Sequence, residues 1–317
     1  MQSPGRKESS SSKKDASSPR KRDAIERLLA KPPVLAKSGL SQLRYLVLVE
    51  GLSADESGYC PYRPYVWTVL LRVQPSVASS YVGLVKRGPS KAYSKIRNDT
   101  FRTMATDEKF RSKVPEAALI RLLNSYSWAS ANGSESAYVQ GMNVLAAPFL
   151  YACRSEAQAF TLFSTVIARD CPLYVTPALD GVHTGLKLLD RCLAVVDPPL
   201  ASFLKERLLP AELYAFASVL TFSACTPPLS EVLVLWDFLF AYGVHMNILL
   251  VVAQLVRMRN RIMNADSPIS VLRQFPALDA RAIIRVAVAF VQQIPNSLYD
   301  QLARHPYDPR VSDELRS

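Results

Sequence analysis

The stretch Val114-Pro-Glu-Ala-Ala-Leu-Ile-Arg-Leu-Leu-Asn-Ser-Tyr126 carries the clearest structural signal in the chain. Its apolar side chains recur every three or four residues, which is the spacing of the buried face of an α-helix. Pro115 stands near the start of the stretch, where a helix tolerates proline because that N–H has no intrahelical partner. The stretch therefore predicts a helix that packs one face against a core.

The same pattern continues on both sides of this stretch. We expect a helix from 41 to 51 and another with Pro64 in its first turn. Further helices are expected over 139–152, 155–169, 178–196, 199–207, 210–222, 229–242, 244–262, 279–293 and 296–303. Prolines separate these segments, and there is neither a hairpin turn between alternating strands nor a βαβ rhythm.

Composition supports the same fold class. Apolar residues make up 49% of the 317 residues, and only 11 are glycine, which favours helices over a β-sandwich or a Rossmann fold. We therefore predict an all-α, multi-helix single globular unit over residues 35–305. Residues 306–317 are expected to form a C-terminal tail.

Residues 1–22 differ from the rest of the chain. They hold seven Lys/Arg, two Asp/Glu and almost no bulky apolar side chain, which predicts a disordered, basic, Ser-rich tail. Ser3 and Ser18 each precede a proline and then a basic residue, the pattern preferred by cyclin-dependent kinases, so both are candidate phosphorylation sites. A merely solvated tail is the alternative, and the basic run 20–22 also fits a nuclear-import signal. Asp23 is expected to cap a short helix that ends at the prolines 32–33.

Several function classes are excluded or disfavoured. Five cysteines without CxxC spacing and three scattered histidines predict buried thiols and no metal site. The apolar runs are far shorter than the ~18 residues of a membrane span, and no signal peptide is visible, so we expect a cytoplasmic protein. The absence of GxxxxGK[ST] means that the chain is not itself a P-loop NTPase, and no nucleic-acid-binding motif accompanies the basic tail.

Two clusters carry residues suited to chemistry, Ile96-Arg-Asn-Asp-Thr-Phe-Arg-Thr103 and Tyr138-Val-Gln-Gly-Met-Asn143. Arginine neutralises charge that develops on a transferring phosphoryl group, and a glutamine amide orients an attacking water. A protein that offers both has the side chains that GTP hydrolysis most needs from outside the GTPase.

On a helix, Asp99 and Arg102 share a face, so the carboxylate can hold the guanidinium in place. Gln140 would lie at a helix start, and Gly141 would leave room for close approach by a partner. Each pattern has a plain alternative: a surface ion pair in the first case, and a helix-start glutamine without a role in the second.

Four motifs in order distinguish these readings. Arg63-Pro-Tyr-Val-Trp67 precedes the two clusters, and Trp236-Asp-Phe-Leu-Phe-Ala-Tyr-Gly243 follows them. The order RxxxW, IxxDxxR, YxQ and WD…G resembles the TBC domain of Rab-type GTPase-activating proteins over nearly the whole globular length. The segments 41–51, 138–143, 236–243, 245–248 and 266–276 resemble one subfamily, the fungal mitotic-exit checkpoint proteins that act in the spindle position checkpoint and in septation.

The resemblance implies roles for individual residues. Arg102 would be the arginine finger and Gln140 the glutamine finger, with Asp99 orienting Arg102. Trp67 would lie in the core and Arg63 would brace the finger-bearing region. Tyr138 and Gly141 belong to the same motif as supporting residues.

The resemblance also implies partners and a location. The chain would activate a small Ras/Rab-like GTPase of the mitotic-exit network, together with a larger scaffold subunit, in the cytoplasm and at the spindle pole body. No cofactor is expected, since magnesium and GTP would belong to the GTPase. The alternative is a catalytically silent TBC scaffold that binds the GTPase and checkpoint partners.

Overall fold

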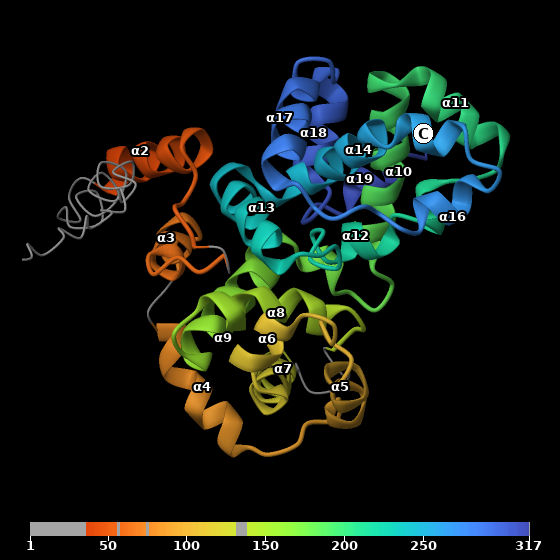
Figure 1. Cartoon of the computed structure of the whole chain (residues 1–317). Helices are drawn as coiled ribbons and strands as arrows, with labels where there is room; N and C mark the ends of the chain where they lie inside the picture. The colour runs from red at the N-terminus through yellow and green to blue at the C-terminus, as the bar shows by residue number, and fades with distance from the viewer. Residues whose placement is uncertain (1–35, 56–57, 74–75, 131–137, 317) are drawn as a thin grey trace, which may run out of the picture.

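The computed structural model describes residues 36–55, 58–73, 76–130 and 138–316. Every regular element in these ranges is a helix (Figure 1), so the predicted all-α fold class is confirmed. None of these helices is long and apolar enough to cross a membrane. The predicted tail of residues 1–22, the candidate phosphorylation sites Ser3 and Ser18, and the helix expected after Asp23 lie outside the described residues.

The first half of the chain contains α2 (Ala36–Val49), α3 (Arg63–Leu70), α4 (Ser76–Lys86), α5 (Tyr93–Thr100), α6 (Glu108–Lys113), α7 (Glu116–Ser130), α8 (Met142–Ala152), α9 (Glu156–Thr165) and the π-helix η2 (Val166–Asp170). The second half contains η3 (Pro172–Tyr174), α10 (Asp180–Val196), α11 (Pro198–Glu206), η4 (Ala211–Leu213), α12 (Phe216–Leu220), α13 (Leu229–Tyr242), η5 (Val244–Met246), α14 (Asn247–Arg257), α15 (Arg259–Met263), α16 (Pro268–Leu272), α17 (Ala280–Val291), α18 (Asn296–Arg304) and α19 (Arg310–Glu314).

The helices form two lobes (Figure 1). The lower lobe holds α4 to α7, and the upper lobe holds α10 to α12 and α14 to α19. Helices α8 and α9 pack on α7, while α8 also contacts α13, which in turn contacts α2, α3 and α17. Helix α13 therefore joins the two lobes.

The long predicted helices are present, and the differences have local causes. The segment expected as one helix over 210–222 is divided into η4 and α12, and positive φ angles at Phe222 and Ser223 end the second piece. The segment 244–262 is divided into η5, α14 and α15. Helices α4, α6, α16 and α19 were not predicted. α6 shows why: its sequence EKFRSK has only Phe110 as a buried side chain, so it carries no apolar period.

An aromatic cluster forms the core where α3, α8 and α13 meet. The ring of Trp67 lies 5.7 Å from Phe149, 6.2 Å from Trp236 and 5.0 Å from Phe240, measured between ring centroids. Trp67 is fully buried, as predicted. Both buried indole N–H groups have partners, since Trp67 donates to Asp237 at 2.7 Å and Trp236 donates to the carbonyl of Phe222 at 3.0 Å.

A buried ion pair lies beside this cluster. Arg63 donates to the carboxylate of Asp237 through Nε and through Nη2, each at 3.0 Å. Its Nη1 donates to the carbonyl of Gly58. The two side chains are 1% and 4% exposed. Arg63 thus connects α3 to α13 and makes no hydrogen bond to α5. The resemblance implies that Arg63 braces the region that carries Arg102, whereas its hydrogen-bond partners are Asp237 and Gly58.

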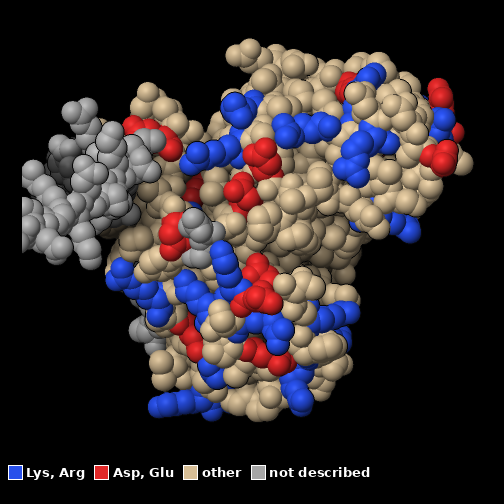
Figure 2. Space-filling view, viewed as in Figure 1, with Lys and Arg blue, Asp and Glu red and all other residues tan. Residues whose placement is uncertain are grey.

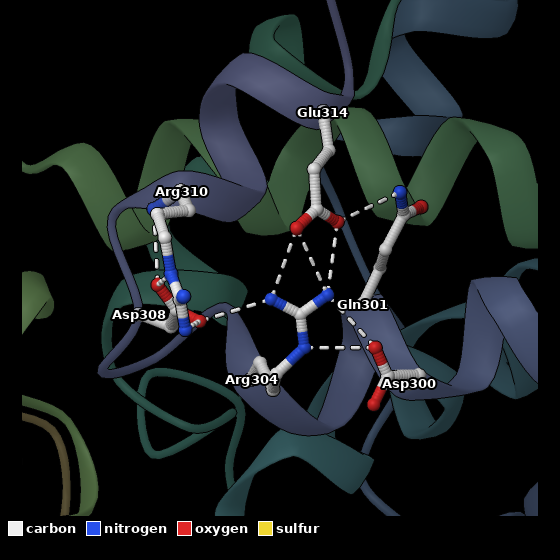
Figure 3. A network of polar contacts seen from close by, with 6 residues as sticks. All are labelled: Asp300, Gln301, Arg304, Asp308, Arg310 and Glu314. Atoms are coloured by element: carbon white, nitrogen blue, oxygen red, sulfur yellow. Dashed lines mark hydrogen bonds and ion pairs between the residues drawn. The ribbon is translucent and has the colours of Figure 1, made fainter.

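The C-terminal residues pack against the domain. The sequence predicts a tail over 306–317, whereas the structure has α19 there with Val311 fully buried. Arg304 of α18 fastens this segment by ion pairs with Asp308 and Glu314, and it also pairs with Asp300 of its own helix (Figure 3). The packed structure therefore extends past residue 305.

Replacing Asp237 by alanine is expected to lower the free energy of unfolding by about 3–5 kcal/mol, because it leaves the buried Arg63 charge without its carboxylate and the buried Trp67 N–H without an acceptor. Urea unfolding followed by circular dichroism measures the loss. Asp266→Ala is the matched control, since Asp266 is exposed and forms no ion pair within the described residues. Equal stability of the two variants would contradict the assigned role.

His305 is buried, and we expect its contribution to the stability of the fold to depend on pH. Its Nδ1 lies 2.6 Å from the carbonyl of Leu302 and its Nε2 lies 2.9 Å from the hydroxyl of Tyr174. The neutral ring satisfies both contacts, with Nδ1 donating and Nε2 accepting. Burial lowers the pKa of His305 to about 3, and burial lowers the pKa of His245 to about 4.

The folded state therefore resists protonation of His305, while the unfolded chain takes up the proton near its ordinary pKa of about 6.5. The contribution of His305 to stability should fall by about 2 kcal/mol between pH 7 and pH 5. Burial raises the pKa of Asp190 to about 6, which acts in the opposite direction, so variants must be compared at each pH. The difference in unfolding free energy between wild type and His305→Gln should shrink towards pH 5. A difference independent of pH would refute this.

Candidate functional site

The arginine of the first cluster projects from the end of α5. Ile96 is fully buried and fixes the helix to the core, and Asp99 in its last turn is 7% exposed. Helix α5 ends at Thr100, so Arg102 lies in the turn after the helix. The predicted contact is present, since the guanidinium of Arg102 binds Oδ1 of Asp99, while the Arg102 side chain remains 54% exposed. The guanidinium of Arg102 is thus oriented by Asp99 and remains accessible to solvent.

Tyr138 joins the second cluster to this pair. Its hydroxyl donates to Oδ2 of Asp99 at 2.8 Å. Burial and this hydrogen bond both raise the pKa of Tyr138, so the hydroxyl stays protonated and remains a donor. Asp99 therefore binds one residue of each cluster through its two carboxylate oxygens.

Asn143 is the last residue of the second cluster, and the sequence alone predicts no role for it. Its Nδ2 donates to the hydroxyl of Thr103 at 2.9 Å, and its Oδ1 accepts the backbone N–H of Gly141 at 3.1 Å. Thr103 in turn donates to the carbonyl of Asp99 at 3.0 Å. Asn143 thus bridges the turn after Arg102 and the turn after Gln140. The only sequence signal for this role is its place three residues after Gln140.

Gly141 is required by the backbone and by packing. Its φ of +103° lies in the left-handed region, and it caps the start of α8, three residues later than the predicted helix start. A Cβ at this position would lie 2.5 Å from Cδ2 of Leu220 on α12. The glycine therefore accommodates a neighbouring helix of the same chain, and its role in admitting a partner stays a prediction.

Gln140 lies immediately before this glycine. Its side chain is exposed and makes no hydrogen bond to any described residue. The amide donor and acceptor are therefore both available to a bound molecule.

Arg102 and Gln140 line one open groove of about 980 Å³. Its walls come from the α5 end, the start of α8 and helix α12, and its apolar floor includes Met104, Val144, Leu179, Phe216 and Leu220. Asp99, Tyr138 and Gly141 also line the groove, whereas Arg63 and Trp67 lie in the core and do not. The groove thus brings together five of the seven predicted catalytic and supporting residues.

The chemistry of the groove is that of a cation beside a free amide. Within the described ranges, no group of three His, Cys, Asp or Glu residues is placed to hold a metal ion. Four of the five cysteines are buried as expected, while Cys225 is exposed and lines the groove. The arrangement can supply positive charge and an oriented hydrogen-bonding group to the reacting atoms of another molecule.

Comparison with known proteins agrees with this arrangement. The family profile of the Rab-GTPase-TBC domain matches residues 60–263. The chain belongs to the RabGAP-TBC family. The match includes the groove residues of both clusters and the Arg63–Asp237 ion pair.

Two curated TBC relatives are similar over most of their length. The chain is 47% identical to "Cell division control protein 16" of Schizosaccharomyces pombe, covering 90% of this chain and 94% of the relative. It is also 47% identical to "Mitotic check point protein BUB2" of Saccharomyces cerevisiae, covering 91% and 98%. Among solved structures, the Ypt/Rab-GAP domain of Gyp1p superposes with a TM-score of 0.72 at 17% identity, covering 88% of this chain and 98% of that domain, which shows a shared TBC fold.

Gly141→Ala is expected to destabilise the domain and to displace Gln140, because alanine is strained at this φ and its Cβ meets Leu220. A loss of about 1–3 kcal/mol is expected in urea unfolding. Gly141→Ala combined with Leu220→Ala would remove the collision but keep the backbone strain, so the two changes should be less than additive.

Gly83→Ala is the control, since a Cβ there meets nothing within 4 Å and the glycine lies inside α4. That change should stabilise the domain slightly, because alanine favours the helix. A Gly141→Ala variant as stable as Gly83→Ala would contradict the packing argument.

Proposed function

We propose that the chain is a GTPase-activating protein that supplies Arg102 as an arginine finger and Gln140 as a glutamine finger to a small Ras/Rab-like GTPase. One observation carries the proposal: the two side chains line one groove and their turns are joined through Asp99, Tyr138 and Asn143. Membership of the RabGAP-TBC family supports the activity class.

Each finger would act on a different part of the reaction. The guanidinium of Arg102 would neutralise negative charge that develops on the γ-phosphate, and the amide of Gln140 would orient the attacking water. Magnesium and GTP would belong to the GTPase, so the chain needs no cofactor of its own. Asp99 restricts the directions that Arg102 can take, which reduces the entropy lost when the finger is positioned.

The biological setting is proposed from the named relatives. The names of the two yeast proteins place them in cell division control and a mitotic checkpoint. We propose the same setting here: regulation of mitotic exit and septation within the spindle position checkpoint, with a larger scaffold subunit as a second component. A cytoplasmic pool and a pool at the spindle pole body would follow from that setting.

A catalytically silent TBC scaffold is the second candidate. It would use the groove to bind the GTPase without accelerating hydrolysis. The free amide of Gln140 and the exposed guanidinium of Arg102 favour the catalytic candidate, because a purely binding surface requires neither group to be held free at a groove.

The test is single-turnover hydrolysis by the mitotic-exit GTPase loaded with GTP, with and without the scaffold subunit. Arg102→Ala should slow the stimulated rate on the order of 10³-fold or more, and Gln140→Ala should also slow it strongly. Arg281→Ala is the matched control, since Arg281 is exposed on α17 and unpaired in the described structure. No stimulation by wild type, even with the scaffold present, would favour the silent scaffold.

Thermal unfolding separates the chemical role from a structural one. Arg102→Ala should keep the wild-type melting temperature within a few degrees, because a half-exposed surface pair contributes about 0–1 kcal/mol. Trp67→Ala should lower it sharply, because truncating a buried aromatic costs about 3–5 kcal/mol. Equal loss of melting temperature in the two variants would argue against a purely catalytic role for Arg102.

A further inference from the structure

The positive charge of the domain is concentrated in residues 76–121, the segment that contains Arg102. Residues 76–121 hold ten Lys/Arg and four Asp/Glu, an excess of six. Residues 23–317 as a whole have the same excess of six, so the remainder of that range is neutral. Figure 2 shows many Lys and Arg side chains over the lower lobe, where α4 to α7 lie. The lower lobe is therefore a basic surface on an otherwise balanced domain.

Much of this charge is available to a partner. Lys91, Lys95, Arg97 and Arg111 are exposed and form no ion pair within the described residues. In the same segment, Arg102 pairs with Asp99 and Arg121 pairs with Glu156. Unpaired surface cations keep an attractive field for an acidic partner.

An exposed aromatic side chain lies within the basic surface. Phe101, immediately before Arg102, is 69% exposed. Arg97 precedes Phe101 by four residues along α5, so the two lie on the same side of the helix. Aromatic side chains and arginine are both enriched in protein interfaces.

Phe101 faces a hollow separate from the catalytic groove. This hollow has a volume of about 260 Å³, and Phe101 and Arg111 line it together with Val114 and Pro115. Glu116 is its acidic member, and the Thr100 hydroxyl donates to the Glu116 carboxylate at 3.3 Å. The turn that carries Phe101 and Arg102 thus has the finger groove on one side. On the other side is a hollow lined by both polar and apolar side chains, in which Arg111 is the basic residue and Glu116 the acidic one.

We propose that Arg97, Phe101 and Arg111, here called the α5–α6 surface, dock an acidic face of the partner GTPase that presents an apolar side chain to the hollow. This inference rests on the proposed function and deepens it. The two arginines raise the rate of encounter by electrostatic attraction, and Phe101 slows dissociation by burial. The fingers act on the bond that breaks, whereas the α5–α6 surface sets how often and how long the GTPase is held.

The position of the surface favours a protein partner. A GTPase that receives Arg102 in its nucleotide site must cover the turn that carries Phe101, so both residues would be buried by the same molecule. A membrane rich in anionic lipid would also attract the basic helices, and it is the competing outcome of the test.

The first experiment measures association by stopped flow with the mitotic-exit GTPase bound to a fluorescent non-hydrolysable GTP analogue. The full chain carrying Arg97→Glu and Arg111→Glu should associate about tenfold more slowly than wild type at low salt. The gap should close at high salt, because the effect is electrostatic. The control is Lys187→Glu with Lys205→Glu, which makes the same charge change at exposed lysines of α10 and α11 that form no ion pair in the described part of the chain.

The second experiment tests the anchor. Phe101→Ala should raise the dissociation constant about tenfold, mostly through faster dissociation. Tyr45→Ala is the control, since Tyr45 of α2 is 63% exposed and lies outside the basic segment. In hydrolysis assays the α5–α6 changes should raise the half-saturating concentration, whereas Arg102→Ala should lower the maximal rate.

Three results would decide the matter. Association and affinity equal to those of the controls would overturn the inference. It would also be overturned if the variants lost binding to phosphatidylserine vesicles but bound the GTPase like wild type, because the surface would then serve a membrane. Surface-dependent binding without any stimulation of hydrolysis would support docking while refuting the proposed catalytic function.

Discussion

The ion pair between Arg63 and Asp237 is the constraint that holds α3 against α13, the helix that joins the two lobes. Burying both charges carries a large desolvation cost, which is offset only because the carboxylate also accepts the Trp67 N–H and the guanidinium also binds the Gly58 carbonyl. These contacts fix α3 against α13, and α13 contacts α8 in the aromatic core. The groove lined by Arg102 and Gln140 lies between α5, α8 and α12, and α8 packs against α13 in this core.

Within the groove, a small hydrogen-bonded frame sets the positions of Arg102 and Gln140. Asp99 is the centre of the frame, because its two oxygens hold Arg102 and Tyr138. Asn143 fastens the backbone on both sides. Arg102 and Gln140 remain exposed while Asp99, Tyr138 and Asn143 beside them are buried, so the surface presents the two side chains on a fixed frame.

Catalysis and recognition would occupy different residues of one short turn. Arg102 faces the groove, while its neighbour Phe101 faces the hollow beside α6. This separation would allow the affinity for a GTPase to change without altering the groups that act on the phosphate. The concentration of positive charge in residues 76–121 fits that division, since long-range attraction requires net charge but no defined pairing.

The sequence by itself determined the all-α class, the longer helices, the burial of Trp67 and the Asp99–Arg102 contact. These features depend on neighbours within one or two helical turns, where apolar period and i, i+3 spacing are sufficient. It did not predict α6 or α19, which are too short to show a period. Only the tertiary structure decided that Arg63 binds a carboxylate 174 residues away, that Gly141 makes room for Leu220, and that Asn143 joins the two finger turns. Those contacts arise from how helices pack on one another, and no local pattern records which side chains will meet across the core.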